Sequence, residues 1–150
     1  MKVKICEEGF DPWNEARLYQ EASAGIFGKF GATGIFIGTM RDFNEGDGVL
    51  GMTLEHYPGM TEKELENIVG DASRRWQILD ALVVHRVGEI RPNEPIVLVS
   101  VWAAHRGDAF DASRYIMEAL KSKAPFWKKE RLQSEQERWV GGNSDGYKKI

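Results

Sequence analysis

The chain has 150 residues, of which 42% are hydrophobic and 29% are charged, a length and composition ordinary for one globular domain. Its net charge of −3 argues against a general nucleic-acid binder, and no apolar run approaches the roughly 20 residues of a membrane span. Cys6 is the only cysteine, which excludes an internal disulfide and a cysteine-rich metal site.

The N-terminal residues predict a strand and then a helix. Residues 3–6 alternate in polarity and favour a short strand, and they lack the long apolar core of a signal peptide. We therefore expect a cytoplasmic protein. The pair Asp11-Pro12 combines an N-cap residue with proline at the first helical position, which predicts a helix from there to about Ala24.

Two β-rich stretches follow, at residues 32–40 and 49–57. The polar segment 42–48 between them predicts a turn, so we expect the two strands to pair as a hairpin with an acidic tip. Arg41, at the mouth of this turn, is a cation at the end of a strand that looks buried. A surface salt bridge with the acidic residues of the turn explains Arg41 equally well.

The middle of the chain predicts one helix and two more strands. Thr61 followed by Glu64 has the pattern of a capping box, which predicts a helix reaching about Trp76. Strands are expected at residues 81–84 and 96–103, joined through a turn rich in proline.

Asp108 is expected to cap a last helix, whose apolar face continues to Leu120. Pro125 should end that helix, and the chain after it should be extended. The order of elements predicts an α+β fold, with a largely antiparallel sheet and helices packed on it. Residues 1–140 form the single predicted domain, and residues 141–150 are a polar, flexible tail.

Positive charge is concentrated in the last third of an otherwise acidic chain. Residues 1–84 carry 8 Lys/Arg against 14 Asp/Glu, whereas residues 85–131 carry 9 against 6. Residues 120–130 alone contain four lysines, two large aromatic residues and Pro125. Local accumulation of this kind favours a site for a small anion over a general basic surface, although scattered solvated charges are an alternative.

Lys121 and Lys128 lie on opposite sides of the break at Pro125, so two different elements can direct them to one point. Partial burial beside Phe126 and Trp127, close to other cations, should lower a lysine pKa and make the amine available as a base or nucleophile. A basic helix end that only complements the helix dipole is the alternative.

The two His-Arg doublets have different interpretations. His105-Arg106 lies between a strand and the predicted helix, where free backbone N–H groups suit an anion; a solvated strand end is the alternative. His85-Arg86 is interpreted as mainly structural. A zinc site made by the three histidines, with His56 as the third, lacks any known spacing, so we predict no metal.

Several segments, in this order along the chain, resemble the large, catalytic subunit of molybdopterin synthase. The similarity covers roughly residues 30–140. The segments are Gly38-Thr39-Met40-Arg41, Leu54-Glu55-His56-Tyr57-Pro58-Gly59-Met60, His85-Arg86-Val87-Gly88-Glu89, Ala104-His105-Arg106 and the run from Lys121 to Glu130.

The resemblance implies an α+β, hammerhead-like fold and a sulfurtransferase activity. The family's enzyme converts cyclic pyranopterin monophosphate into molybdopterin by forming a dithiolene. The sulfur arrives as a thiocarboxylate on the C-terminal Gly-Gly of a small ubiquitin-like subunit. Two large subunits form a dimer, with a small subunit at each end of a heterotetramer, and no cofactor is implied.

The resemblance also implies roles for seven residues. Lys121 and Lys128 match the family's catalytic lysines, and His105 with Arg106 matches positions that bind the phosphate and the pterin. The remaining positions implied to line the pocket are Arg41, lent across the dimer, Met117 and Glu130. The residues alone also allow a non-enzymatic module that binds a ubiquitin-like chain end, or a phosphate-binding hydrolase.

Overall fold

The computed structural model describes residues 1–141, so the predicted tail lies outside the described residues except for Gly141. Its elements, in chain order, are β1 (Lys2–Cys6), α1 (Pro12–Ala22), a 3-10 turn (Ala24–Ile26), β2 (Ala32–Thr39), β3 (Phe43–Asn44), β4 (Asp47–His56), α2 (Met60–Arg75), β5 (Ile78–Arg86), β6 (Gly88–Ile90), β7 (Pro95–Ala103), α3 (Arg106–Lys123), β8 (Phe126–Leu132) and β9 (Glu137–Val140). No helix among these is long and apolar enough to cross a membrane.

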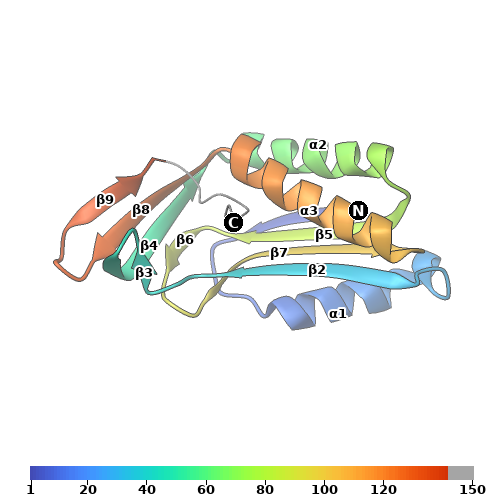
Figure 1. Cartoon of the computed structure of the whole chain (residues 1–150), viewed down its shortest axis with the longest axis horizontal. Coiled ribbons are helices and arrows are strands. Elements are labelled where there is room, and N and C mark those ends of the chain that lie inside the picture. The colour runs from blue at the N-terminus through green and yellow to red at the C-terminus, as the bar shows by residue number, and fades with distance from the viewer. Residues whose placement is uncertain (142–150) are drawn as a thin grey trace.

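A four-stranded sheet in the order β1-β5-β7-β2 forms the larger layer. β1 runs parallel to β5, and the other neighbours are antiparallel. Helices α2 and α3 lie side by side over one face, and α1 covers the other (Figure 1). This arrangement confirms the predicted α+β class with a largely antiparallel sheet.

The central strands β5 and β7 are buried on both faces because helices cover both sides of the sheet. Alternate residues of β5 divide between two cores: Val83 packs under α2 and α3, whereas Leu82 packs against α1. The same alternation on β7 places Val99 in the first core and Leu98 in the second. Both strands are therefore continuous apolar runs, as expected for strands covered on both faces.

A second sheet, of five strands, continues from one end of the first (Figure 1). Its strands follow the order β3-β4-β8-β9, and β6 pairs with β4. A separate apolar core, which includes Met52, Leu54 and Leu132, holds this sheet together. The junction between the two sheets is where α3 ends and β8 begins.

The predicted hairpin of residues 32–40 and 49–57 is wrong. β2 pairs with β7 in the first sheet, and β4 pairs with β8 in the second. The predicted turn does form, at Glu45 and Gly46, but it joins the short strand β3 to β4 and not β2 to β4. The chain therefore passes from one sheet to the other at Arg41.

Two predicted helix starts also need correction. Asp11 caps α1 as expected, by accepting hydrogen bonds from the next turn. However, α2 begins after Gly59, whose N–H donates to the carboxylate of Glu62, and Thr61 is not its cap. The helix α3 starts at Arg106, two residues before Asp108, which therefore lies in the first turn and favours the positive end of the helix dipole.

Candidate functional site

A cleft of about 1040 Å³ opens where the two sheets meet. The end of α3, the end of β2, and strands β8 and β9 all contribute to its walls. Its volume is at the upper end of the usual range for small-molecule sites. The cleft is also rich in cations, because Arg41, Lys121 and Lys128 all line it.

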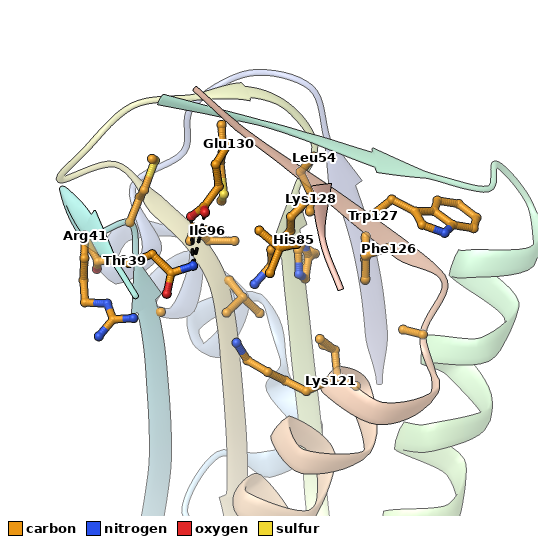
Figure 2. Close-up of a pocket in the computed structure, with 18 of the residues that line it drawn as sticks. Thr39, Arg41, Leu54, His85, Ile96, Lys121, Phe126, Trp127, Lys128 and Glu130 are labelled. Carbon is orange, nitrogen blue, oxygen red and sulfur yellow. Dashed lines mark hydrogen bonds between the residues drawn. The ribbon is translucent and has the colours of Figure 1, made fainter. Parts of the chain in front are cut away.

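The break between α3 and β8 directs two lysines into this cleft. The helix ends at Lys123, Ala124 is already extended, and β8 begins immediately after Pro125. The hydroxyl of Thr61 holds the break, because it donates to the carbonyl of Pro125 at 3.2 Å. As predicted, Lys121 and Lys128 converge from the two elements (Figure 2).

Burial and neighbouring cations lower the pKa of both lysines, as expected from the sequence. Burial has the largest effect on Lys128, followed by repulsion from Lys121, and its pKa falls to about 8. The pKa of Lys121 is lowered first by burial, while Glu118 opposes this and Arg41 adds to it. Near neutral pH, Lys128 can therefore both give up and accept a proton at modest cost.

Arg41 lies in the cleft of its own chain (Figure 2). The sequence resemblance implied that it serves the neighbouring subunit, and this stays a prediction for the dimer. Its guanidinium lies 4.9 Å from the centre of the Phe43 ring, a cation–π contact that orients the side chain. Met117, on the buried face of α3, lines the same cleft and is 6% exposed.

His85 was interpreted as structural, and the structure shows that its side chain also lines the cleft. Its ring stacks on Phe126 with centroids 4.0 Å apart, and its Nδ1 donates to the carbonyl of Arg86 at 2.8 Å. Burial, with Lys128 and Lys121 nearby, lowers its pKa to about 4. The imidazole is therefore neutral at pH 7. Arg86 itself is structural, paired with Glu94.

Glu130 is buried in the cleft wall, and residues that the sequence did not single out hold it. Both of its carboxylate oxygens accept from the Asn44 amide, at 3.1 and 3.2 Å, and Oε1 also accepts from Arg138 Nε at 3.0 Å. Dashed lines at Glu130 in Figure 2 mark hydrogen bonds to its carboxylate. Asn44 and Arg138 belong to strands β3 and β9, which are short. The sequence carried no signal for a β9 strand, and so none for Arg138.

His105 and Arg106 lie elsewhere, at the opposite end of α3 from Lys121. Both are exposed, and neither lines the cleft. An α-helix rises about 1.5 Å per residue, so Arg106 and Lys121 are about 22 Å apart along the axis. They do occupy the predicted strand-to-helix junction, where the first N–H groups of α3 are free of intrahelical partners. One chain alone does not bring all seven predicted site residues together.

Among residues 1–141, no group of three or more His, Cys, Asp or Glu side chains is placed to hold a metal ion. The three histidines are dispersed: His56 is 3.6 Å from Glu62, His85 is in the cleft, and His105 precedes α3.

Comparison with known proteins adds independent findings. The model of the family described as MoaE protein matches residues 9–123. The molybdopterin synthase catalytic subunit of Ralstonia nicotianae is 59% identical over 138 residues, which is 92% of this chain and 76% of that protein.

Solved structures agree with the fold. Molybdopterin synthase from Staphylococcus aureus matches with a TM-score of 0.81 and 30% identity, over 94% of this chain and 98% of that one. A complex of subunits 1 and 2 of the molybdopterin-converting factor from Helicobacter pylori matches with a TM-score of 0.75 over 93% of this chain and 90% of that one. At 19% identity, this second likeness concerns the fold alone.

Proposed function

Because this chain belongs to the MoaE protein family, we propose that its cationic cleft is where sulfur transfer takes place. The protein is the catalytic subunit of molybdopterin synthase, an enzyme of molybdenum cofactor biosynthesis. It transfers sulfur from the C-terminal thiocarboxylate of a small ubiquitin-like subunit to cyclic pyranopterin monophosphate. The single observation that carries the choice of site is the convergence of Lys121 and Lys128 from two elements.

The two lysines have different parts in the proposed reaction. Lys121, at the end of α3, lies beside the incoming thiocarboxylate and assists transfer of its sulfur to the pterin side chain. Lys128 serves as an acid or base, or it stabilises developing negative charge, which its pKa of about 8 suits. Arg41 adds a third cation, and Met117 and Glu130 form the wall around them.

His105 and Arg106 fit the same site only if a neighbouring subunit supplies them. The sequence resemblance assigns them to the phosphate and the pterin, yet they lie at the far end of α3 from the cleft of their own chain. In the dimer of large subunits, we place this helix end of one copy at the cleft of the other. Arg106 then forms a bidentate contact with the phosphate, and the free N–H groups at the start of the helix donate further hydrogen bonds to it.

The sulfur must come from outside, since Cys6 lies on β1 and does not line the cleft. A thiocarboxylate is an anion, so the cations of the cleft suit it as they suit a phosphate. The H. pylori structure is itself a complex of two subunits, in keeping with a small sulfur-carrying partner here. For a biosynthetic enzyme of this kind, we propose the cytoplasm as its location.

The direct test mixes this protein with a thiocarboxylated small subunit and the cyclic precursor, and then assays the dithiolene. We expect product only when all three are present. Hydrolysis of the precursor without the sulfur-carrying subunit, with no dithiolene formed, would favour a hydrolase acting alone. Binding of the small subunit without any binding of a pterin phosphate would favour a non-enzymatic module.

The sharing of the site between subunits has its own test. Arg106→Ala and Lys121→Ala proteins, each inactive or weak alone, are unfolded together, refolded and assayed as mixed dimers. We expect activity to return, since one of the two sites in a mixed dimer then has both intact residues. Failure of mixed dimers to regain activity would remove His105 and Arg106 from the partner's cleft.

A further inference from the structure

Arg138, on β9, makes several polar contacts at the edge of the cleft. Its Nε donates to Glu130 at 3.0 Å and its Nη1 to Asp47 at 2.8 Å. Its Nη2 donates to the main-chain carbonyl of Asn44 at 3.0 Å, and Glu45 lies 3.7 Å away. One guanidinium therefore ties β9 to β8 and to the β3–β4 turn.

Arg138 contacts each of the acidic residues that line the cleft among the described residues. The acidic residues that line the cleft are Glu45 and Glu130, and Arg138 pairs with both. Glu130 is 7% exposed, so its charge is largely removed from water and depends on this partner and on the Asn44 amide. The buried carboxylate of the cleft is therefore already paired, whereas Glu45 is exposed and paired only loosely.

The position of Glu130 makes this occupation matter. Lys128 and Glu130 are two residues apart on β8, so their side chains leave the same face of the strand, about 7 Å apart. A lysine side chain is long enough to cover that distance and form an ion pair. Directly across from Glu130 on β9 stands Arg138, whereas the residue across from Lys128 is Val140.

We propose that Arg138 is a positioning residue for this site, which holds Glu130 away from Lys128 and so leaves the lysine for the substrate's anionic groups. The role of Lys128 in this statement rests on the proposed function. The charge separation itself does not, because it is a property of the free protein. Without Arg138, Lys128 is a cation within reach of Glu130 on the same face of β8.

The protonation of Lys128 reports this arrangement. In the wild-type protein, burial and repulsion from Lys121 both lower the pKa of Lys128. Glu130 raises it, with a smaller effect than either. The charged or titratable groups that face Lys128 from the packed elements are Lys121 on α3, Arg41 after β2, Glu130 on β8 and His85 on β5. On the neighbouring strands, the residues opposite Lys128 are the apolar Leu54 and Val140.

The test measures the Lys128 pKa directly, by NMR of protein carrying ¹³C-labelled lysine, with the signal assigned through its loss in Lys128→Arg. In Arg138→Met, the freed Glu130 should turn to Lys128 and raise its pKa by about one unit. Arg138→Gln, which keeps hydrogen-bond donors at the position, should raise it by less. If both variants are folded and the pKa is unchanged, the proposal is wrong.

Two further variants separate the cause. Glu137→Gln breaks the exposed Lys129–Glu137 pair, at 2.9 Å, which joins the same two strands outside the cleft. We expect no change in the Lys128 pKa there, and an equal rise would show that loosening of the strand pair is responsible. Adding Glu130→Gln to Arg138→Met should cancel the rise, and a rise that persists would also overturn the proposal.

Activity assays then distinguish this proposal from the proposed function. A raised Lys128 pKa, with the kcat–pH profile shifted by the same amount, supports both. If Lys128 acts as a base, kcat near pH 7 falls roughly tenfold and recovers at higher pH, since one unit changes the free amine about tenfold. A raised pKa with unchanged kcat at every pH would leave Arg138 as the partner of Glu130 but would remove Lys128 from the chemistry.

Discussion

Lys128 and Lys129 are neighbours on β8, yet they differ in almost every physical respect. Lys128 points into the cleft, where burial and other cations lower its pKa to about 8. Lys129 points outward, where Glu137 raises its pKa. The same difference separates Lys121, half-buried in the cleft wall, from Lys123, which is exposed. Strand and helix geometry, and not lysine content, therefore selects which ammonium groups can react.

Removal of an inward lysine should have the largest effect. Lys121→Ala should lower dithiolene formation by about 10²- to 10⁴-fold, the usual contribution of a positioned acid, base or charge. Because the ammonium is at the cleft and not in the core, the melting temperature and the affinity for the small subunit should hardly change. Product is measured in the three-component assay. Full activity would remove Lys121 from the mechanism.

Arg106→Ala should have a smaller effect and a different kinetic signature. Loss of a charge-assisted contact with phosphate costs about 1.5–3 kcal/mol, which corresponds to roughly a 10- to 100-fold rise in KM. The value of kcat should fall less, because Arg106 holds the phosphate and not the group to which sulfur is transferred. Titration of the cyclic precursor into the variant, without the small subunit, checks the binding loss. Unaltered affinity would place the phosphate elsewhere.

Lys128→Met should make the protein more stable at pH 7. The pKa of Lys128 is about 8 in the folded protein, against 10.5 for an ordinary lysine, so folding disfavours its proton by up to about 3 kcal/mol. The unfolded chain binds more protons between pH 8 and 10.5, and wild-type stability therefore rises with pH there. Urea unfolding at pH 7 and pH 10 should show the difference between the two proteins shrinking. A difference independent of pH would contradict burial of the charge.

The outward lysines should give the smallest effects. Lys123→Ala and Lys129→Ala should each stay within about twofold of wild-type activity, because Lys123 is exposed and Lys129 pairs with Glu137 outside the cleft. The same assay applies, with both variants beside Lys121→Ala. If Lys123→Ala were as damaging as Lys121→Ala, the distinction between inward and outward lysines would be wrong.

The parts of the site that follow from local chemistry could be predicted. Pro125 lacks an N–H and restricts Ala124, so a helix break between the two lysines follows from the sequence. Partial burial beside Phe126 similarly predicted lowered lysine pKa values. The caps were harder: Thr61 has the residue type of an N-cap, but its hydroxyl is used by the distant carbonyl of Pro125.

The parts that depend on distant pairing could not be predicted. The turn residues near Gly46 gave a hairpin, but nothing local reveals that β2 joins β7 and that β4 joins β8. The same limit concealed the partnership of Glu130 and Arg138, which register places directly opposite each other. His85 looked structural because a buried strand histidine usually is. Its position in the cleft wall appears only when the two sheets meet.

The bond from Thr61 to Pro125 joins residues far apart in the chain, as does the pairing of β4 with β8. Contacts of such wide sequence separation form late in folding, because closing long loops costs entropy first. A newly made chain therefore has only ordinary, protonated lysines, and the lowered pKa of Lys128 appears only when folding is complete. During refolding, we expect the fast amine-labelling reactivity of Lys128 to emerge together with the last kinetic phase and not before it.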